Sequence, residues 1–392
     1  MSHDVFSRIE QASGLLMERS AAADALGRLP DETAKQLKDT GLVRLLQPAE
    51  FGGYEADPRD FLSAVMNVGN WCPSAGWIAG VVGVHPWELA LNDPRLQEEV
   101  WGEDPDTWVA SPYAPSGTAV MVDGGYTVNG HWQFSSGTDH CEWVVLGAMV
   151  PGSDAEATPT GMLHVMLPRR DYEIVEDSWN VMGLAGTGSK DIVIRDAFVP
   201  DYRTIDVAKV MDGRAATEAG RTQPLYRLPW STMFPTAVSA GLVGIAEGVL
   251  RCAVEYQQGR VSALGVAQAS DPHSRAAIGE AAAEIRSART QLLYDVGELF
   301  DGLRTGHEVT LEQRVACRRD QVSVAWRAAK AADAVYGLCG GNALRLDKPL
   351  QRFWRGMHAG LNHAVFTAGP VYDDAAGMLM GFPPKGPAAM TI

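Results

Sequence analysis

The spacing of the apolar residues changes twice along this chain of 392 residues. From Val5 to about Trp101, apolar side chains recur every three or four positions, as in amphipathic helices. From Thr107 to about Asp206 the segments are short, rich in β-branched residues and separated by Gly and Pro, as strands are. Helical spacing returns after a connector from Arg214 to Pro235. We therefore predict a mostly α, α+β chain with a helical domain, a β domain and a second helical domain, at 1–106, 107–218 and 219–392.

Individual helix and strand predictions support this division into three domains. Pro30 with Asp31 and Glu32 predicts a helix start, and Pro94 opens another short helix. Four long amphipathic segments with short links predict an antiparallel bundle, at Ala237–Gln258, Ala276–Leu303, Leu311–Leu338 and Leu350 to about Phe366. The predicted strands are Tyr126–Phe134, Trp143–Val150, His164–Pro168 and Asp191–Pro200.

Charge and composition exclude several classes of function. The formal net charge of −15 would repel phosphate backbones and anionic lipid, so we expect no nucleic-acid partner. Trp143–Val150, a long apolar run, is far shorter than the ~20 residues of a membrane span, and no secretion signal is visible, so we expect a cytoplasmic protein without a membrane helix. The five scattered cysteines lack metal-ligand spacing, so we expect small buried side chains and no metal.

Five short segments, in this order, resemble the acyl-CoA dehydrogenase superfamily over nearly the whole chain: Gly76–Trp77, Trp132–Gly137, Gly183–Ser189 running into Val199–Pro200, Gln258–Arg260 and Cys339–Asn342. The resemblance implies an N-terminal helical domain, a central β-sandwich or barrel and a C-terminal four-helix bundle. It also implies a flavin between the β domain and the bundle. Members assemble as homotetramers in which the bundle of one subunit completes the cofactor site of its neighbour.

Within that superfamily the chain is similar to the oxygenase components of two-component flavin monooxygenases, among them the secosteroid 4-hydroxylases and the 4-hydroxyphenylacetate 3-hydroxylases. The similarity rests on Val84–Trp87, Glu98–Asp104, Ser111–Pro115 and Gln351–Arg355 with His358 and His363. It implies a monooxygenase that takes reduced FMN, or FADH2, from a separate NAD(P)H:flavin reductase. With O2 it would hydroxylate a small aromatic substrate through a flavin C4a-hydroperoxide, in aromatic or steroid catabolism.

The strand end at Trp132–Gly137 is the first candidate cofactor segment. Backbone groups and hydroxyls at such a turn are free to face a ligand, so Phe134, Ser135 and Ser136 are predicted to contact the flavin, with Ser136 also acting at the reacting atoms. The alternative is a Ser turn that closes a hairpin. The resemblance adds Ser111, Pro112 and Tyr113, and Trp77 as a ring-facing aromatic that is equally compatible with a core position.

Arg260 and the break at Gly341 and Asn342 form the second candidate segment. A guanidinium suits bidentate capture of the flavin phosphate, and the resemblance implies that this arginine reaches the cofactor of an adjacent subunit. The alternatives are a surface ion pair for Arg260 and a helix C-cap at Gly340–Gly341. Gly183–Ser189 precedes a strand and does not open a helix, so we predict a tight turn and no Rossmann domain.

Two histidines are catalytic candidates. The resemblance places His363, with Ala364, at the flavin and the phenolic substrate, where a histidine neutral near pH 7 can act as the base that forms the phenolate. The similar steroid hydroxylases carry Asp four residues further on, where this chain has Thr367. His85 is a candidate to hydrogen-bond the peroxide, and a core role is equally open for it. His358 and His363 are five apart on the expected last helix, which does not suit a shared metal.

Two other functions stay open at this point. An acyl-CoA-type dehydrogenase with tightly bound FAD would need a glutamate base, and no matching Tyr-Glu-Gly-Thr element is found near the C-terminus. A catalytically silent helical interaction protein would bind no flavin. Phe366, Met378, Met380 and Phe382 are candidates to line the aromatic site, and the alternative is that they serve only as packing.

Overall fold

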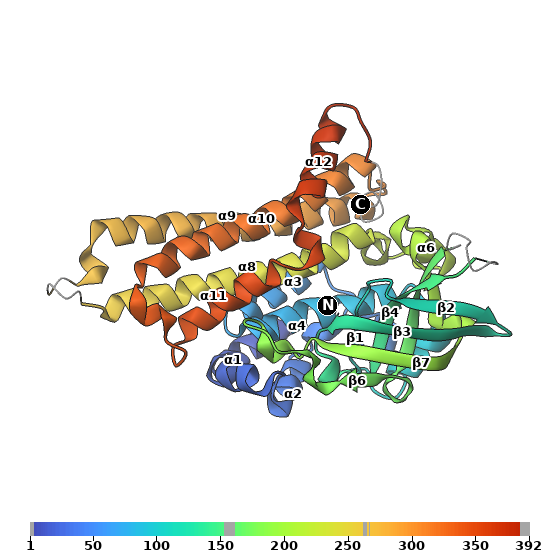
Figure 1. The fold of residues 1–392 in the computed structure, drawn as a ribbon. Coiled ribbons are helices and arrows are strands. Elements are labelled where there is room, and N and C mark those ends of the chain that lie inside the picture. Colours follow the sequence, from blue (N-terminus) through green and yellow to red (C-terminus); the bar gives the residue numbers. More distant parts are fainter. Residues whose placement is uncertain (1–3, 153–160, 262–264, 266, 385–392) are drawn as a thin grey trace.

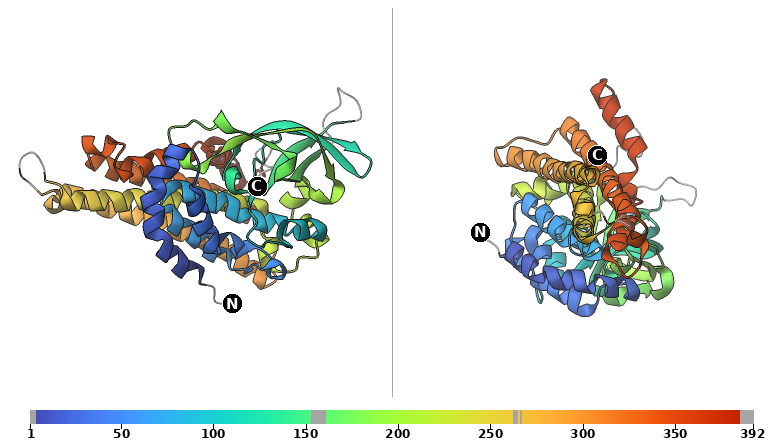
Figure 2. Two further views of the ribbon diagram at one scale, coloured as in Figure 1. Left: turned by 90° about the horizontal axis from the view of Figure 1, so that it is seen from below. Right: turned by 90° about the vertical axis from the view of Figure 1, so that its left-hand side faces the viewer.

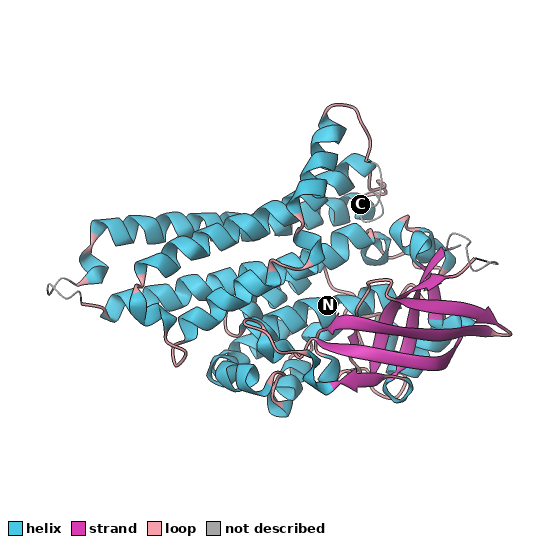
Figure 3. Ribbon diagram, in the orientation of Figure 1, coloured by secondary structure: helices cyan, strands magenta, loops and turns pink. Residues whose placement is uncertain are grey.

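The computed structural model describes residues 4–152, 161–261, 265 and 267–384. A helical unit, a sheet and a long helical bundle follow one another in the predicted order (Figures 1 and 3). The first part contains α1 (Val5–Leu26), α2 (Asp31–Asp39), α3 (Pro58–Gly69), α4 (Pro73–Leu89) and α5 (Pro94–Trp101). The last part contains α6 (Val207–Met211), α7 (Arg214–Glu218), α8 (Trp230–Gly259), α9 (Pro272–Arg304), α10 (Leu311–Leu338), α11 (Pro349–Gly360) and α12 (Ala368–Leu379).

Short sequence signals set many helix starts. Asp57, Asp93 and Asp271 each precede a proline at the first helical position, and each carboxylate accepts a hydrogen bond from a backbone N–H of the first turn. This pairing suits a helix start because the carboxylate occupies a free donor and the proline ring fixes φ. Thr310 and Gln313 form a capping box at α10.

One sheet contains all eight described strands, in the order β6-β7-β3-β2-β4-β5-β8, with β1 paired to β4. The strands are β1 (Val109–Ala110), β2 (Gly117–Val122), β3 (Gly125–Ser135), β4 (Trp143–Val150), β5 (Gly161–Pro168), β6 (Glu173–Val175), β7 (Lys190–Pro200) and β8 (Thr204–Asp206). β3 pairs with β2 on one side and with β7 on the other. Its last residue, Ser135, therefore lies opposite Lys190, the first residue of β7.

Helices α3, α4 and α8 pack almost backbone to backbone. A Cβ at Gly76 would lie 2.3 Å from the Cα of Gly69, and one at Gly80 would lie 2.7 Å from the carbonyl oxygen of Ala237. No side chain fits at these distances, so the glycines are required by close approach. This packing fixes α4, which carries several site residues, against the bundle.

The bundle contains α8, α9, α10 and α11, whereas α12 packs across α10 and projects from the bundle (Figures 1 and 2). Helix α10 has the predicted bounds, but α8 begins at Trp230, inside the segment predicted as a connector. Pro235 lies inside α8 and cannot donate to the carbonyl of Ser231. The side-chain amide of Gln321 donates to that carbonyl at 2.8 Å, so the helix continues through the proline.

The structure corrects one further prediction about the bundle and adds a helix that was not predicted. The last predicted helix, to about Phe366, ends at Gly360, and His363 lies in the following turn, before a 3-10 helix at Ala364–Phe366. Helix α12 was not predicted. Among the described helices, α8 is long and apolar enough to cross a membrane, but 78% of its most apolar stretch is buried in the protein, as in a core helix.

Candidate active site

A cluster of aromatic rings lies where α4, α8 and the segment after α11 meet. The imidazole of His363 has its centroid 5.8 Å from the ring of Trp77 and 6.1 Å from that of Phe234. Phe366 lies on the same segment, 6.5 Å from His363. Three elements distant in sequence thus build an apolar wall around a titratable side chain. We call Trp77, Phe234, His363 and Phe366 the ring pocket.

His363 is held as the N-cap of the short 3-10 helix. Its Nδ1 accepts a hydrogen bond from the backbone N–H of Val365 at 3.2 Å. Burial first, and the charge of Arg318 second, lower the pKa of His363 to about 4. The imidazole is therefore neutral at pH 7, with its proton on Nε2.

The end of β3 approaches the ring pocket through Ser136. The indole Nε1–H of Trp77 donates to Ser136 Oγ at 3.2 Å, and this oxygen lies 2.8 Å from Ser189 Oγ. Ser189 in turn lies 2.7 Å from Thr187 Oγ1, so the Gly183–Ser189 turn is bonded to the predicted cofactor segment. Ser136 therefore belongs to a closed hydroxyl network that orients Trp77.

Phe134 and Ser135 are unusual in ways that suit a bound flavin. Phe134 has φ of 68°, and its side chain is 63% exposed. A strained backbone and an exposed ring are features of binding segments. Ser135 is fully buried, yet its Oγ has no hydrogen-bond partner among the described residues. An orphaned hydroxyl at this position fits a polar edge of the isoalloxazine ring, which could supply the missing partner.

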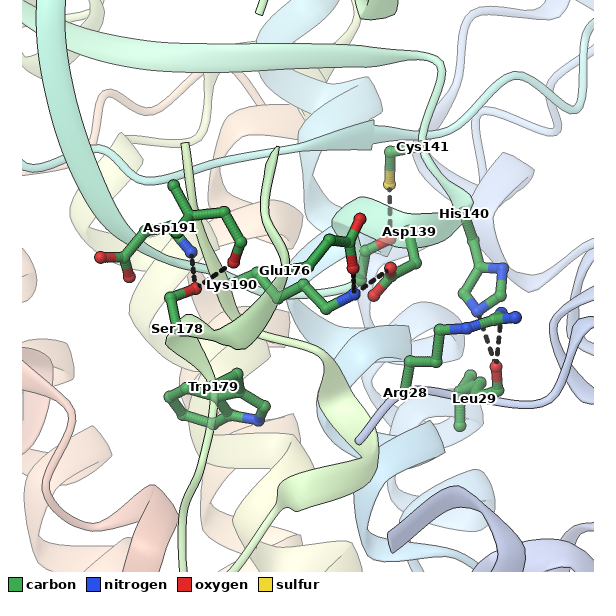
Figure 4. A network of polar contacts seen from close by, with 12 residues as sticks. Arg28, Leu29, Asp139, His140, Cys141, Glu176, Ser178, Trp179, Lys190 and Asp191 are labelled. Carbon is green, nitrogen blue, oxygen red and sulfur yellow. Dashed lines mark hydrogen bonds and ion pairs between the residues drawn. The ribbon is translucent and has the colours of Figure 1, made fainter. Parts of the chain in front are cut away.

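Lys190, which lies opposite Ser135, joins the two short 3-10 helices at Thr138–His140 and Glu176–Ser178 (Figure 4). Its ammonium lies 2.6 Å from Asp139 and 2.6 Å from Glu176, and its side chain is mostly buried. Burial alone lowers the pKa of Lys190, but hydrogen bonds to the two carboxylates outweigh it and raise the pKa above its ordinary value. The close-up also shows Ser178, whose hydroxyl accepts from the N–H of Asp191 at 2.8 Å. One oxygen of Asp139 pairs with Lys190 and the other has no hydrogen-bond partner among the described residues, so the ammonium with its two carboxylates acts mainly as a structural support.

His85 and Ser111 form a second buried pair. His85 Nδ1 lies 2.5 Å from the carbonyl oxygen of Val109, so this nitrogen donates. Nε2 then accepts from the Ser111 hydroxyl at 2.6 Å. Burial lowers the pKa of His85 to about 4. Because both ring nitrogens are occupied, any contact between His85 and a bound ligand would run through Ser111.

Tyr113 connects this pair with a buried carboxylate that the sequence analysis did not single out. Its hydroxyl donates to Glu88 at 2.6 Å, and the other oxygen of Glu88 lies 2.5 Å from Nδ1 of His164. The ring of Tyr113 packs edge-on against Phe234 at 4.9 Å, which joins it to the ring pocket. Burial by itself raises the pKa of Glu88, but the charge of His164 and the hydrogen bonds from His164 and Tyr113 outweigh it, so the pKa lies below its ordinary value.

Arg260 lies far from the ring pocket in the same chain. It follows Phe234 by 26 residues at the other end of α8, about 39 Å away along the helix axis. There its Nη1 donates to the carbonyl of Leu338 at 2.6 Å, at the end of α10. The break with Gly341 and Asn342 follows directly. The second candidate segment is thus brought together, but away from the first.

Comparisons with known proteins agree with this geometry. A model of the acyl-CoA dehydrogenase C-terminal domain matches residues 236–368. The chain is 52% identical to a pigment production hydroxylase of Rhodococcus erythropolis, over 100% of both chains. It is 41% identical to the flavin-dependent monooxygenase oxygenase subunit HsaA of Mycobacterium tuberculosis, over 98% of this chain and 97% of that one. The chain belongs to the flavin-dependent oxygenase components.

Solved structures show the same fold. The 3-HSA hydroxylase from Rhodococcus superposes with a TM-score of 0.94 at 40% identity, covering 100% of this chain and 99% of that chain. XiaF from Streptomyces, solved with FADH2 and glycerol, superposes with a TM-score of 0.91 at 25% identity, covering 98% and 96%. The acyl-CoA dehydrogenase-like fold predicted from the sequence is confirmed.

In this oxygenase component, the predicted site residues fall into two groups. One group lies on elements around the ring pocket and comprises Trp77, His85, Ser111–Tyr113, Phe134–Ser136 and His363. The other group lies at the far end of the bundle and comprises Arg260, Gly341 and Asn342. Ala364 is exposed beside His363. Of the late apolar residues, Phe366 is at the pocket, Met378 packs beside Ala375, and Met380 and Phe382 are exposed. His358 pairs with Asp333 at 2.7 Å on the outside of α11.

The cysteines and the possible metal ligands can also be located in the structure. All five cysteines are free and buried, as expected of small core side chains. No group of three His, Cys, Asp or Glu residues suited to a metal occurs in the described part of the chain. The missed residues are Glu88, His164 and Arg318. A glutamate inside the buried, apolar helix α4 was a signal that could have found the first of them.

Proposed function

We propose that this oxygenase component hydroxylates a phenolic ring ortho to its hydroxyl group, with reduced FMN or FADH2 supplied by a separate NAD(P)H:flavin reductase. One observation carries the proposal. The ring pocket, which is apolar and holds a neutral histidine, adjoins a strand end with an exposed Phe134 and an orphaned Ser135 hydroxyl. Flat aromatic walls suit both an isoalloxazine and an arene, and their apolar character keeps water out.

The residues of this chain would divide the work as follows. Phe134, Ser135 and the Ser111–Tyr113 segment would hold the cofactor, and Trp77, fixed by Ser136, would pack against it. Reduced flavin, once bound, supplies the two electrons that reduce O2, so that one oxygen atom enters the ring and the other leaves as water. His363 would act at the substrate hydroxyl, because a phenolate is attacked more readily than a phenol.

A second copy of the chain would complete the cofactor site. A single flavin cannot touch both the ring pocket and Arg260, because about 39 Å of α8 separates them. We therefore propose a homotetramer in which Arg260, Gly341 and Asn342 serve a neighbouring subunit. We also propose cytoplasmic localisation and the three-domain division at 1–106, 107–218 and 219–392.

The decisive experiment supplies chemically reduced FMN, or FADH2, to the purified protein under O2 with a panel of phenols. Hydroxylated product is measured against H2O2 for each phenol. We expect ring hydroxylation with at least one phenol, and its loss, by about 10²–10⁴-fold, in His363→Ala. A yellow protein that is bleached by an acyl-CoA would favour the dehydrogenase instead. Release of H2O2 alone with every phenol would refute the proposal.

A further inference from the structure

Arg318 on α10 is a buried charge without a carboxylate partner. Its side chain is only 3% exposed, and no ion pair involves it within the described ranges. Nη1 donates to the side-chain oxygen of Gln321 at 3.1 Å, Nη2 donates to the carbonyl of Val365, and Nε has no partner. Burying a guanidinium that no carboxylate neutralises is unfavourable. Packing alone would not explain an arginine here.

Both hydrogen-bond partners of Arg318, Gln321 and Val365, contact elements that carry residues of the ring pocket. Val365, which receives Nη2 at its carbonyl, donates its N–H to Nδ1 of His363. Gln321 donates to the carbonyl of Ser231 at 2.8 Å and to Thr236 Oγ1 at 2.8 Å. Those two residues bracket Phe234 in the first turns of α8. The guanidinium therefore links the His363 segment to the helix that forms the opposite wall.

Arg318 also acts on the charge state of His363, second to burial. The neighbours on α4, α8 and its own segment are the uncharged rings of Trp77, Phe234 and Phe366, so Arg318 is the charged group of the described chain that acts on it. Thr367 offers no carboxylate that would oppose this effect. A positive neighbour disfavours a second positive charge, so it keeps the imidazole neutral.

We propose that Arg318 is a positioning residue that ties the His363 segment to α8 and, together with burial, keeps the imidazole neutral, with its proton on Nε2. The inference rests on the proposed function and deepens it. With Nδ1 occupied by the Val365 N–H, the free nitrogen is a hydrogen-bond donor. His363 would then stabilise a substrate oxygen by donation, and would act as a base only after the Val365 contact breaks. This differs from the base role that the resemblance implies.

The test uses two variants. Arg318→Met removes both the charge and the two guanidinium donors that contact Gln321 and Val365, whereas Arg318→Lys keeps the charge alone. Arg319→Met is the matched control, because the neighbouring guanidinium is paired with Asp320 at 2.7 and 2.8 Å and does not touch Val365. Carbethoxylation of His363 by diethyl pyrocarbonate, followed by peptide mass spectrometry from pH 4.5 to 8, reports the neutral imidazole. Hydroxylated product per reduced flavin is measured in parallel.

In the wild type and in Arg319→Met, the reactivity of His363 at pH 5 should stay within about twofold of its value at pH 8, as for a pKa of about 4. In Arg318→Met the reactivity at pH 4.5 should fall further below its pH 8 value than it does in the wild type, and the product yield should drop. Arg318→Lys should keep the wild-type pH profile but lose product yield, because one ammonium does not reproduce the two guanidinium donors.

A wild-type pH profile or a wild-type yield in Arg318→Met would overturn the inference. If that variant does not fold, a wild-type yield in a folded Arg318→Lys overturns it instead. Carbethoxylation needs neither flavin nor substrate, so it separates the two proposals. A wild type that hydroxylates no phenol refutes the proposed function, whereas the pH profiles still decide whether Arg318 controls His363.

Discussion

Replacing Glu88 with alanine removes the acceptor that holds both His164 and Tyr113 in the interior. Glu88 and His164 are almost fully buried and lie 2.5 Å apart, and the Tyr113 hydroxyl lies 2.6 Å from the second oxygen. Each hydrogen bond to a charged group contributes about 1.5–3 kcal/mol. Two such bonds agree with the ~3–5 kcal/mol that is lost when one partner of a buried ion pair is deleted. We therefore expect Glu88→Ala to lower the free energy of unfolding by about 3–5 kcal/mol.

Urea unfolding, followed by tryptophan fluorescence at one fixed protein concentration, measures this loss. Glu88→Gln should lose about half as much, because the amide oxygen still accepts one bond. The low pKa of Glu88 stabilises the fold above pH 4.5, and this contribution is lost as the pH falls below that value, so the wild type and Glu88→Gln should converge there. The exposed Glu98, replaced by alanine, is the control and should stay within about 0.5 kcal/mol of the wild type. A loss for Glu88→Ala no larger than that of the control would show that the pair carries no net stability.

Three further predictions concern other parts of the chain. Phe134→Ala should weaken the binding of reduced flavin about tenfold in an anaerobic titration, whereas Phe198→Ala, on the neighbouring strand β7, should not. Inactive Arg260→Ala and His363→Ala subunits, unfolded together and refolded as a mixture, should regain part of the hydroxylation activity; no recovery would argue against a site shared between subunits. Burial and the nearby Asp320 raise the pKa of Asp295 to about 7, so the folded state resists ionisation and stability falls as pH rises from about 4 to 7. Asp295→Asn should therefore raise the stability at pH 8 by on the order of 1 kcal/mol and change little at pH 4, and calorimetry at the two pH values checks this.

The sequence predicted the helices whose ends depend only on residues close by in the chain. The span Leu311–Leu338 was predicted with its observed bounds from apolar spacing, and the structure shows a Thr310 cap before it and a Gly-rich break after it. The start of α8 was missed because Pro235 normally ends a helix, and the replacement donor, Gln321, lies 86 positions further along the chain. The turn at His363 was missed for a related reason, since its N-cap bond lies within a continuous apolar pattern.

The residues of the candidate site likewise divide into those that the sequence pointed to and those that only the structure revealed. Residues in distinctive motifs, such as Trp77 and Ser136, were found because the resemblance marks them, and the structure joins them by one hydrogen bond. Glu88 stands in an apolar helix and Arg318 in a run of charged residues, and the importance of both depends on partners that only the tertiary fold brings near. A single sequence shows the charge, and its role becomes visible only with the contact.

The glycine contacts between α3, α4 and α8 also limit how this enzyme can change its preference among arenes. Because backbone already touches backbone at Gly76 and Gly80, these helices cannot move closer to tighten the pocket or exchange small residues for larger ones. Adaptation to a bulkier or slimmer ring must then come from the opposite side, where the turn after α11 carries His363 and Phe366. Directed evolution for new substrates should start with residues 361–367 and leave the glycine-packed wall intact.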